Sequence, residues 1–201
     1  MRYLISILLL IGLVNTVQAK TLLVLGDSLS AAYGISPSEG WVSLMADRLS
    51  QESADYQVVN ASVSGETTSG GLNRLPSLLA THTPQWVLIE LGANDALRGT
   101  PISVIRENLS TLIELSLAAD AQVLLIGIRI PSNYGARYGD AFFELFTEVA
   151  DHYEVDRVPF LLENVALNWD LMQSDGLHPN AQAQPVILDN VWPFVERLLE
   201  D

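Results

Sequence analysis

The chain has 201 residues, 49% of them hydrophobic, with 24 acidic and 10 basic side chains and a net charge of −14. This length and composition fit one globular domain with a sizeable core, and the negative charge disfavours nucleic acid and anionic lipid surfaces as partners. The chain contains no cysteine, which excludes disulfides, a thiol nucleophile and cysteine-ligated zinc.

Residues 1–19, MRYLISILLLIGLVNTVQA, have the three-part layout of a secretory signal peptide. A basic Arg2 is followed by the apolar stretch Leu4–Val14 and by small residues at the end. The apolar stretch is shorter than the roughly 20 residues that span a bilayer, so an uncleaved anchor is the weaker alternative. We expect cleavage after Ala19 and a periplasmic or secreted domain of residues 20–201, with net charge −15 because Arg2 is removed, and with no stable membrane span.

Short apolar runs alternate along the chain with longer amphipathic segments. The apolar runs predict strands buried on both faces, at residues 21–26, 56–63, 86–92, 122–130 and 157–162. The segments between and after them predict helices at residues 38–52, 69–81, 101–119, 136–154 and 180–199. This alternation predicts a five-stranded parallel sheet covered by helices on both faces, a three-layer α/β/α fold.

Small and polar residues follow the first three predicted strands. They read GDS at 26–28, NASVSGE at 60–66 and GAND at 92–95. Turns after strands commonly contain these residue types, so one such segment alone indicates little. The carboxyl ends of parallel strands form the ligand crevice of such folds, however, and three segments converging there indicate a site if a base is also present.

His178 is the candidate base. A serine hydroxyl becomes a nucleophile when a neighbouring base, itself oriented by a third group, removes its proton. His178 lies in SDGLHPN just before the last predicted helix, and Asp175 precedes it by three residues, close enough for the carboxylate to reach the Nδ1–H. The other two histidines, His82 at a predicted helix end and His152 in an acidic helix, are expected to be structural or solvated.

Four separated motifs resemble those of the SGNH or GDSL hydrolases, a family named for Ser, Gly, Asn and His. The motifs are GDSLS, ASVSGETTSGG, LGANDALRG and SDGLHPNAQAQ, and the match spans essentially the whole mature chain. Together with IRIPSNYGARY they look most like the exported acyl-thioesterase, arylesterase and lysophospholipase branch. The resemblance implies a flavodoxin-like fold and a broad hydrolase of acyl esters and thioesters that needs no cofactor.

The resemblance also implies a role for each motif residue. By matching position, Ser28 would be the nucleophile, His178 the general base and then acid, and Asp175 the carboxylate that orients it. The backbone N–H groups of Ser28 and Gly65 and the side-chain amide of Asn94 would form the oxyanion hole. Negative charge developing on a carbonyl oxygen needs preorganised donors, which suits a glycine N–H and an asparagine amide.

Other residues near these motifs are expected to be structural. Asp27 and Asp95 are interpreted as turn and loop anchors, and we expect no metal because no histidine or cysteine clusters with them. Rival serines are interpreted as ordinary turn residues, and two tyrosines as packing: Ser30, Ser62, Ser64, Tyr134 and Tyr138. The sequence around Ser28 lacks G-x-S-x-G, so the α/β-hydrolase elbow is not the template.

Two alternative functions stay open. The same residues would serve a carbohydrate O-acetyl esterase or an acyltransferase, because the motifs encode acyl chemistry and not the acyl group. A non-catalytic binding module would lack the serine, an oxyanion donor or the base, and this chain lacks none of them. We expect the protein to act as a monomer on small acyl esters or thioesters.

We predict that the exported protein begins at Lys20. Removal of residues 1–19 is the expected result of signal cleavage after a small residue. An intact-mass measurement on protein from the exported fraction checks this, and a retained Met1 would favour the uncleaved anchor instead.

Overall fold

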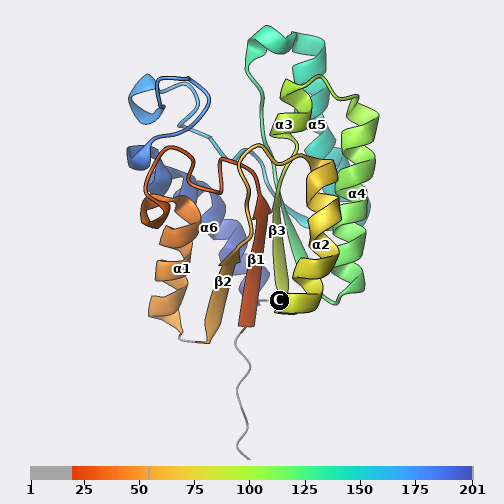
Figure 1. Cartoon of the computed structure of the whole chain (residues 1–201), viewed down its shortest axis with the longest axis vertical. Helices are drawn as coiled ribbons and strands as arrows, with labels where there is room; N and C mark the ends of the chain where they lie inside the picture. The colour runs from red at the N-terminus through yellow and green to blue at the C-terminus, as the bar shows by residue number, and fades with distance from the viewer. Residues whose placement is uncertain (1–19, 54, 201) are drawn as a thin grey trace, which may run out of the picture.

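The computed structural model describes residues 20–53 and 55–200, so the predicted signal peptide lies outside the described residues. Five parallel strands form one sheet in the order β2-β1-β3-β4-β5 (Figure 1). This is the flavodoxin-like strand order, and the predicted fold class is confirmed. The strands are β1 Lys20–Gly26, β2 Tyr56–Asn60, β3 Trp86–Glu90, β4 Gln122–Ile126 and β5 Asp156–Val158.

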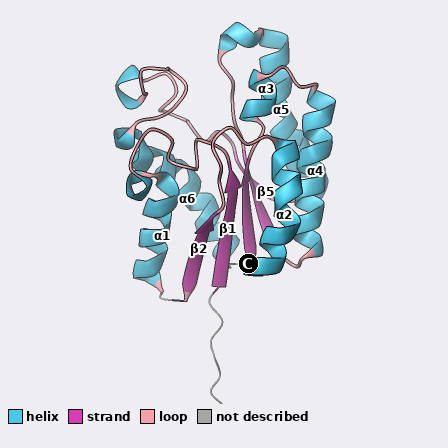
Figure 2. Cartoon of the chain, in the orientation of Figure 1, coloured by secondary structure: helices cyan, strands magenta, loops and turns pink. Residues whose placement is uncertain are grey.

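Helices cover both faces of the sheet (Figure 2). On one face α1 (Trp41–Glu52) packs beside α6 (Gln184–Glu200). On the other, α2 (Thr68–His82), α4 (Ile102–Ala118) and α5 (Ala136–Tyr153) lie side by side. Short helical turns complete the chain: η1 Pro37–Glu39, α3 Ala93–Leu97, η2 Ser132–Tyr134, η3 Trp169–Leu171 and η4 Ala181–Ala183. Among the helices described, none has the length and apolar character needed to cross a membrane.

The three central strands hold the core. In β1, Leu22 to Leu25 are fully buried, and every residue of β3 is buried. The prediction of two buried faces is wrong for β2 and holds poorly for β5, because both are edge strands with partly exposed residues. An apolar run therefore indicated a strand correctly in each case, but its place in the sheet decided its burial.

Several strands end earlier than predicted. Residues 61–63, 127–130 and 159–162 lie beyond the last ladder pairs and form loops at the carboxyl edge of the sheet. At Gly127 the segments after β4 and β5 lie close together, because a Cβ at this residue would lie 2.3 Å from the carbonyl oxygen of Pro159. The short helix α3 was not predicted, because its five residues are too few to show helical periodicity.

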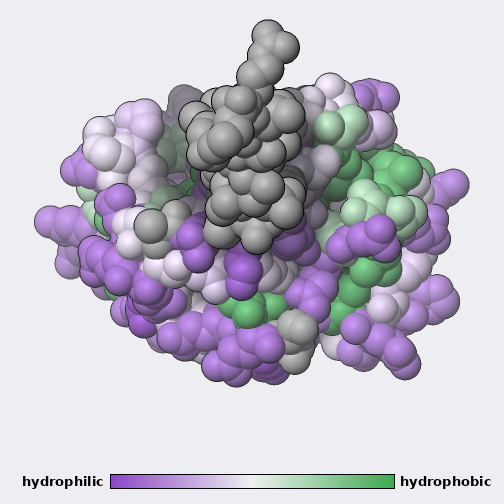
Figure 3. Space-filling view, turned by 90° about the horizontal axis from the view of Figure 1, so that it is seen from below, coloured by the Kyte–Doolittle hydropathy of each residue, from purple (hydrophilic) through white to green (hydrophobic). Residues whose placement is uncertain are grey.

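The two ends of the sheet differ in character. Figure 3 shows the end at which the strands begin, where the surface around the grey atoms is largely hydrophilic. The loops that follow the strands gather at the opposite end (Figure 1). The five residues given a role from the motifs lie in these loops or in α3: Ser28, Gly65, Asn94, Asp175 and His178.

Candidate active site

The first motif forms a tight turn directly after β1. Asp27 is 1% exposed, and its Oδ1 accepts a hydrogen bond from the Leu29 N–H at 3.0 Å. Its backbone carbonyl accepts from the Ala31 N–H at 2.9 Å. These bonds close the turn around Ser28, which is half-buried and faces the carboxyl end of the sheet.

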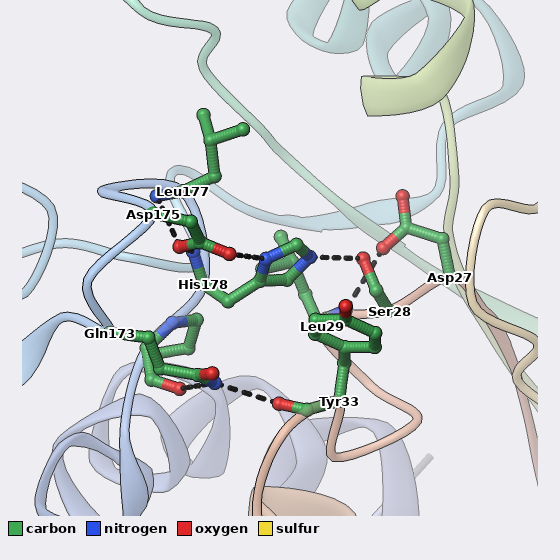
Figure 4. A network of polar contacts seen from close by, with 9 residues as sticks. Asp27, Ser28, Leu29, Tyr33, Gln173, Asp175, Leu177 and His178 are labelled. Carbon is green, nitrogen blue, oxygen red and sulfur yellow. Dashed lines mark hydrogen bonds and ion pairs between the residues drawn. The ribbon is translucent and has the colours of Figure 1, made fainter.

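Ser28, His178 and Asp175 form a hydrogen-bonded chain (Figure 4). His178 Nε2 lies 2.9 Å from Ser28 Oγ, and His178 Nδ1 lies 2.6 Å from Asp175 Oδ2. The carboxylate fixes the proton on Nδ1, so the unprotonated Nε2 faces the hydroxyl. This arrangement can withdraw the serine proton during attack on a carbonyl carbon.

Asp175 is held ionised by donors from its own turn. Its Oδ1 accepts from the Leu177 N–H at 2.9 Å and from the His178 N–H at 3.0 Å. Burial alone would raise the pKa of Asp175, but these two backbone donors and the His178 ring together lower it to about 2. The histidine therefore faces a carboxylate over the whole physiological pH range.

The loop that carries His178 is braced against the loop after β1. Gln173 Nε2 donates to the Tyr33 carbonyl at 2.7 Å and to the Pro179 carbonyl at 2.9 Å. The Tyr33 ring lies 4.5 Å from the His178 ring, tilted by 41°. Figure 4 shows Gln173 and Tyr33 beside the hydrogen-bonded chain. These contacts hold the imidazole within reach of the serine.

Asn94 lies in α3 and points toward the turn after β1. Its Nδ2 donates to Asp27 Oδ2 at 2.9 Å. An ionised carboxylate only accepts hydrogen bonds, so it fixes the amide nitrogen, rather than the oxygen, on its side and leaves the second N–H of that nitrogen available. Gly92, the residue before α3, has a φ of 123°, a conformation that favours glycine, and its position is packed close to Phe142.

Gly65 lies in the loop between β2 and α2. Its φ is 79°, and a Cβ there would meet nothing within 4 Å, so the backbone conformation and not crowding accounts for the glycine. Its carbonyl accepts from Arg98 Nη2 at 3.2 Å. Asp95 in α3 holds the start of α2, directly after this loop, because its two oxygens each accept a 2.8 Å hydrogen bond from Thr68, one from the backbone N–H and one from the hydroxyl.

A cleft of about 1090 Å³ opens beside Ser28, Asn94 and His178. Much of its wall is apolar and comes from the loops after β4 and β5 and from α3: Leu97, Ile128, Ile130, Phe160, Leu162 and Met172. The cleft is large enough for a small organic ligand, and its apolar wall suits a hydrocarbon group.

The chain matches the model of the GDSL-like lipase/acylhydrolase family over residues 24–184. The match includes all four motifs. The chain belongs to this family. It is therefore an enzyme, a hydrolase of the GDSL type, and the resemblance seen in the sequence is confirmed.

Several named proteins are similar to this chain along most of their length. Esterase TesA of Pseudomonas aeruginosa is 49% identical over 192 residues, 96% of each chain. Thioesterase 1/protease 1/lysophospholipase L1 of Escherichia coli is 47% identical over 171 residues, covering 85% of this chain and 81% of the relative. The crystal structure of the psychrotrophic esterase EstA from Pseudoalteromonas sp., inhibited by monoethylphosphonate, superimposes with a TM-score of 0.86 at 45% identity, covering 90% of this chain and 100% of that one.

The other candidates from the sequence are not members of the hydrogen-bonded chain of this GDSL-type hydrolase. Ser30 is buried and donates its hydroxyl hydrogen bond to Glu90 at 2.7 Å. Asp27 and Asp95 make the bonds of turn and loop anchors. Tyr138 donates to the Thr100 carbonyl at 2.6 Å, which is a packing role.

Glu90, the last residue of β3, was not expected from the sequence to take part in the site. This carboxyl is fully buried and contacts the turn that holds Ser28. Its signal in the sequence is an acidic residue at the end of the otherwise apolar run WVLIE. Lys, Glu, Arg and Asp are almost never fully buried without a partner, so such a residue indicates a constrained polar contact.

We predict that the contribution of Asp27 to stability depends on pH. Burial raises the pKa of Asp27 from 3.8 to about 6, against the effects of the Leu29 N–H, His178 and Asn94. Asp27 binds a proton more readily in the folded state than in the unfolded state. Its contribution to the free energy of unfolding is therefore gained as pH falls through 6 and is absent well above pH 6. Wild type should therefore gain about 2 kcal/mol relative to Asp27→Asn between pH 7.5 and pH 4.5, from linkage with these two pKa values.

Denaturant unfolding of both proteins at the two pH values measures this difference. Because Asp175 is present in both proteins, its own titration cancels in the comparison. An unchanged difference between wild type and Asp27→Asn would show that Asp27 does not titrate in this range.

Proposed function

We propose that the protein is an exported serine hydrolase that cleaves acyl esters and thioesters through an acyl-enzyme. The observation that carries the proposal is the hydrogen-bonded chain from Asp175 through His178 to Ser28 at the mouth of the apolar cleft. A carboxylate, an imidazole and a hydroxyl in this order are the elements of a nucleophilic serine.

In the proposed reaction, Ser28 Oγ attacks the acyl carbon while His178 Nε2 takes the hydroxyl proton. The bond to the alkoxide or thiolate leaving group then breaks, and the imidazolium donates its proton to that group. Water then attacks the acyl carbon while His178 Nε2 takes one of its protons, the bond between Ser28 Oγ and the acyl carbon breaks, and the imidazolium returns the proton to Ser28 Oγ as the carboxylic acid leaves. Asp175 stays ionised throughout and stabilises the imidazolium, in line with its lowered pKa.

The proposed oxyanion hole consists of the backbone N–H groups of Ser28 and Gly65 and the side-chain amide of Asn94. The bond from Asn94 to Asp27 supports this role, because it uses one amide hydrogen and leaves the other for the substrate oxygen. Preorganised donors of this kind stabilise the charge that develops in the transition state.

Two findings support fatty-acyl esters and thioesters as the substrate class. Relatives at 47% to 49% identity carry the names esterase and thioesterase 1/lysophospholipase L1. The apolar wall of the cleft would accommodate a hydrocarbon chain whose carbonyl lies at Ser28. A carbohydrate O-acetyl group would leave most of this wall uncovered, which places that alternative second.

The proposal includes export and action as a monomer on a small-molecule substrate. Residues 1–19 support export through their basic, apolar and small-residue order. The negative charge of the chain disfavours nucleic acid as a partner.

We predict that a fluorophosphonate labels Ser28 and that Ser28→Ala loses hydrolysis of every substrate in a panel. The panel contains p-nitrophenyl esters of graded chain length, an acyl-CoA and a lysophospholipid. One nucleophile should serve all of them, because Ser28 Oγ lies 2.9 Å from the Nε2 of the base. Peptide mapping should place the label on GDSLS. Labelling of Ser62 or Ser64, or a panel member still cleaved by Ser28→Ala, would contradict the proposal.

We predict that Asn94→Ala lowers kcat by about 100- to 1,000-fold, the usual cost of one lost oxyanion donor, with little change in KM. Asn108→Ala is the matched control, because the Asn108 amide also donates one hydrogen bond, to Thr68 Oγ1 at 2.9 Å, but lies outside the cleft lining. The control should lower the unfolding midpoint and leave kcat unchanged. The same pattern in Asn94→Ala would remove Asn94 from the oxyanion hole.

A further inference from the structure

Glu90 occupies the end of β3 directly beside the end of β1. In the parallel register it pairs with Gly26, two residues before Ser28. Its side chain is fully buried. It therefore lies underneath the turn of Ser28, on the side of the turn that faces the core.

One oxygen of Glu90 holds the turn at two points. Glu90 Oε2 accepts from the Ser30 hydroxyl at 2.7 Å and from the Asp27 N–H at 3.2 Å. These two residues lie on either side of Ser28 in the chain. A Cβ on Gly26 would lie 2.8 Å from the same oxygen, so the contact requires the glycine of the GDS motif.

The surroundings of Glu90 disfavour a negative charge. Oε1 has no hydrogen-bond partner among the described residues, and none of the ion pairs found in that part of the chain includes Glu90. The nearest ionisable neighbour, Asp27, is itself acidic, and beyond it lie Asp95 and His178. Burial first, and then Asp27, raise the pKa of Glu90 well above its usual range, although hydrogen bonds from Ser30 and Asp27 act against this.

We propose that Glu90 is a positioning residue for the nucleophile, a neutral carboxylic acid whose carbonyl oxygen fixes the turn on both sides of Ser28. The inference rests on the proposed role of Ser28. Its neutrality has a catalytic consequence, because a carboxylate beneath the turn would oppose the negative charge of the tetrahedral intermediate. Glu90 acts through Asp27 and Ser30 and does not touch the substrate.

The test compares two substitutions of similar size. Glu90→Gln keeps a neutral carbonyl acceptor and places an NH2 group where the acid has its hydroxyl, so kcat and its pH profile should stay close to wild type. Glu90→Leu fills the space without an acceptor and should lower kcat by about 10- to 100-fold with KM within about twofold, as expected when a reacting group shifts by a fraction of an ångström to one ångström. Circular dichroism and the unfolding midpoint check that both variants are folded.

A second variant keeps the test decisive if Glu90→Leu does not fold. Ser30→Ala removes only the 2.7 Å bond to Glu90 Oε2 and should lower kcat by a smaller factor, again without a change in KM. Ser28→Ala on the same panel tests the nucleophile separately, so the failure of that role is distinguishable from the failure of this one. A wild-type kcat in folded Glu90→Leu or in Ser30→Ala, or a Glu90→Gln as slow as Glu90→Leu, would overturn the proposal.

Discussion

The central place of β1 in the sheet constrains the whole site. This strand pairs with β2 on one side and β3 on the other, and helices cover both of its faces. A strand buried in this way can carry polar chemistry only where its ladder stops. The chain therefore turns at Asp27 immediately after the last pair, and Ser28 is presented at the edge where the loops after the other strands also arrive.

Three carboxyl groups near Ser28 show how the environment separates side chains of the same chemistry. Asp175 is the most exposed and accepts from two backbone N–H groups and the histidine ring, so its pKa is about 2. Asp27 is buried but has two donors, and its pKa is about 6. Glu90 is fully buried with one oxygen unpartnered among the described residues, and burial raises its pKa well above the usual range. Donors and burial thus give an ionised acid next to the base and a neutral one beneath the turn.

Much of the fold was predictable because β1, β3 and β4 are buried on both faces and therefore continuously apolar. The end of α2 was also predictable, because Pro84 disfavours a helical conformation of the residue before it, and α2 does end at His82, with Thr83 left-handed. The ends of the strands were not. The apolar runs continue into residues 127–130 and 159–162, where the same side chains line the cleft or pack under loops instead of pairing in the sheet. Hydropathy measures burial and does not distinguish these two forms of it.

The sequence by itself determined the order of the candidate functional residues along the chain. A serine, a glycine and an asparagine follow three successive apolar runs, and an acid and a histidine precede the last helix. The spacing of Asp175 and His178 already placed one carboxylate near one imidazole, because three residues in a turn bring them together. Only the tertiary structure decided that this pair meets Ser28, 150 positions away, since no local pattern encodes a contact across the sheet. It also decided the position of Glu90 under the turn of Ser28. That position depends on the β1–β3 register and on the exclusion of water around the carboxyl group, and the sequence of β3 alone encodes neither property.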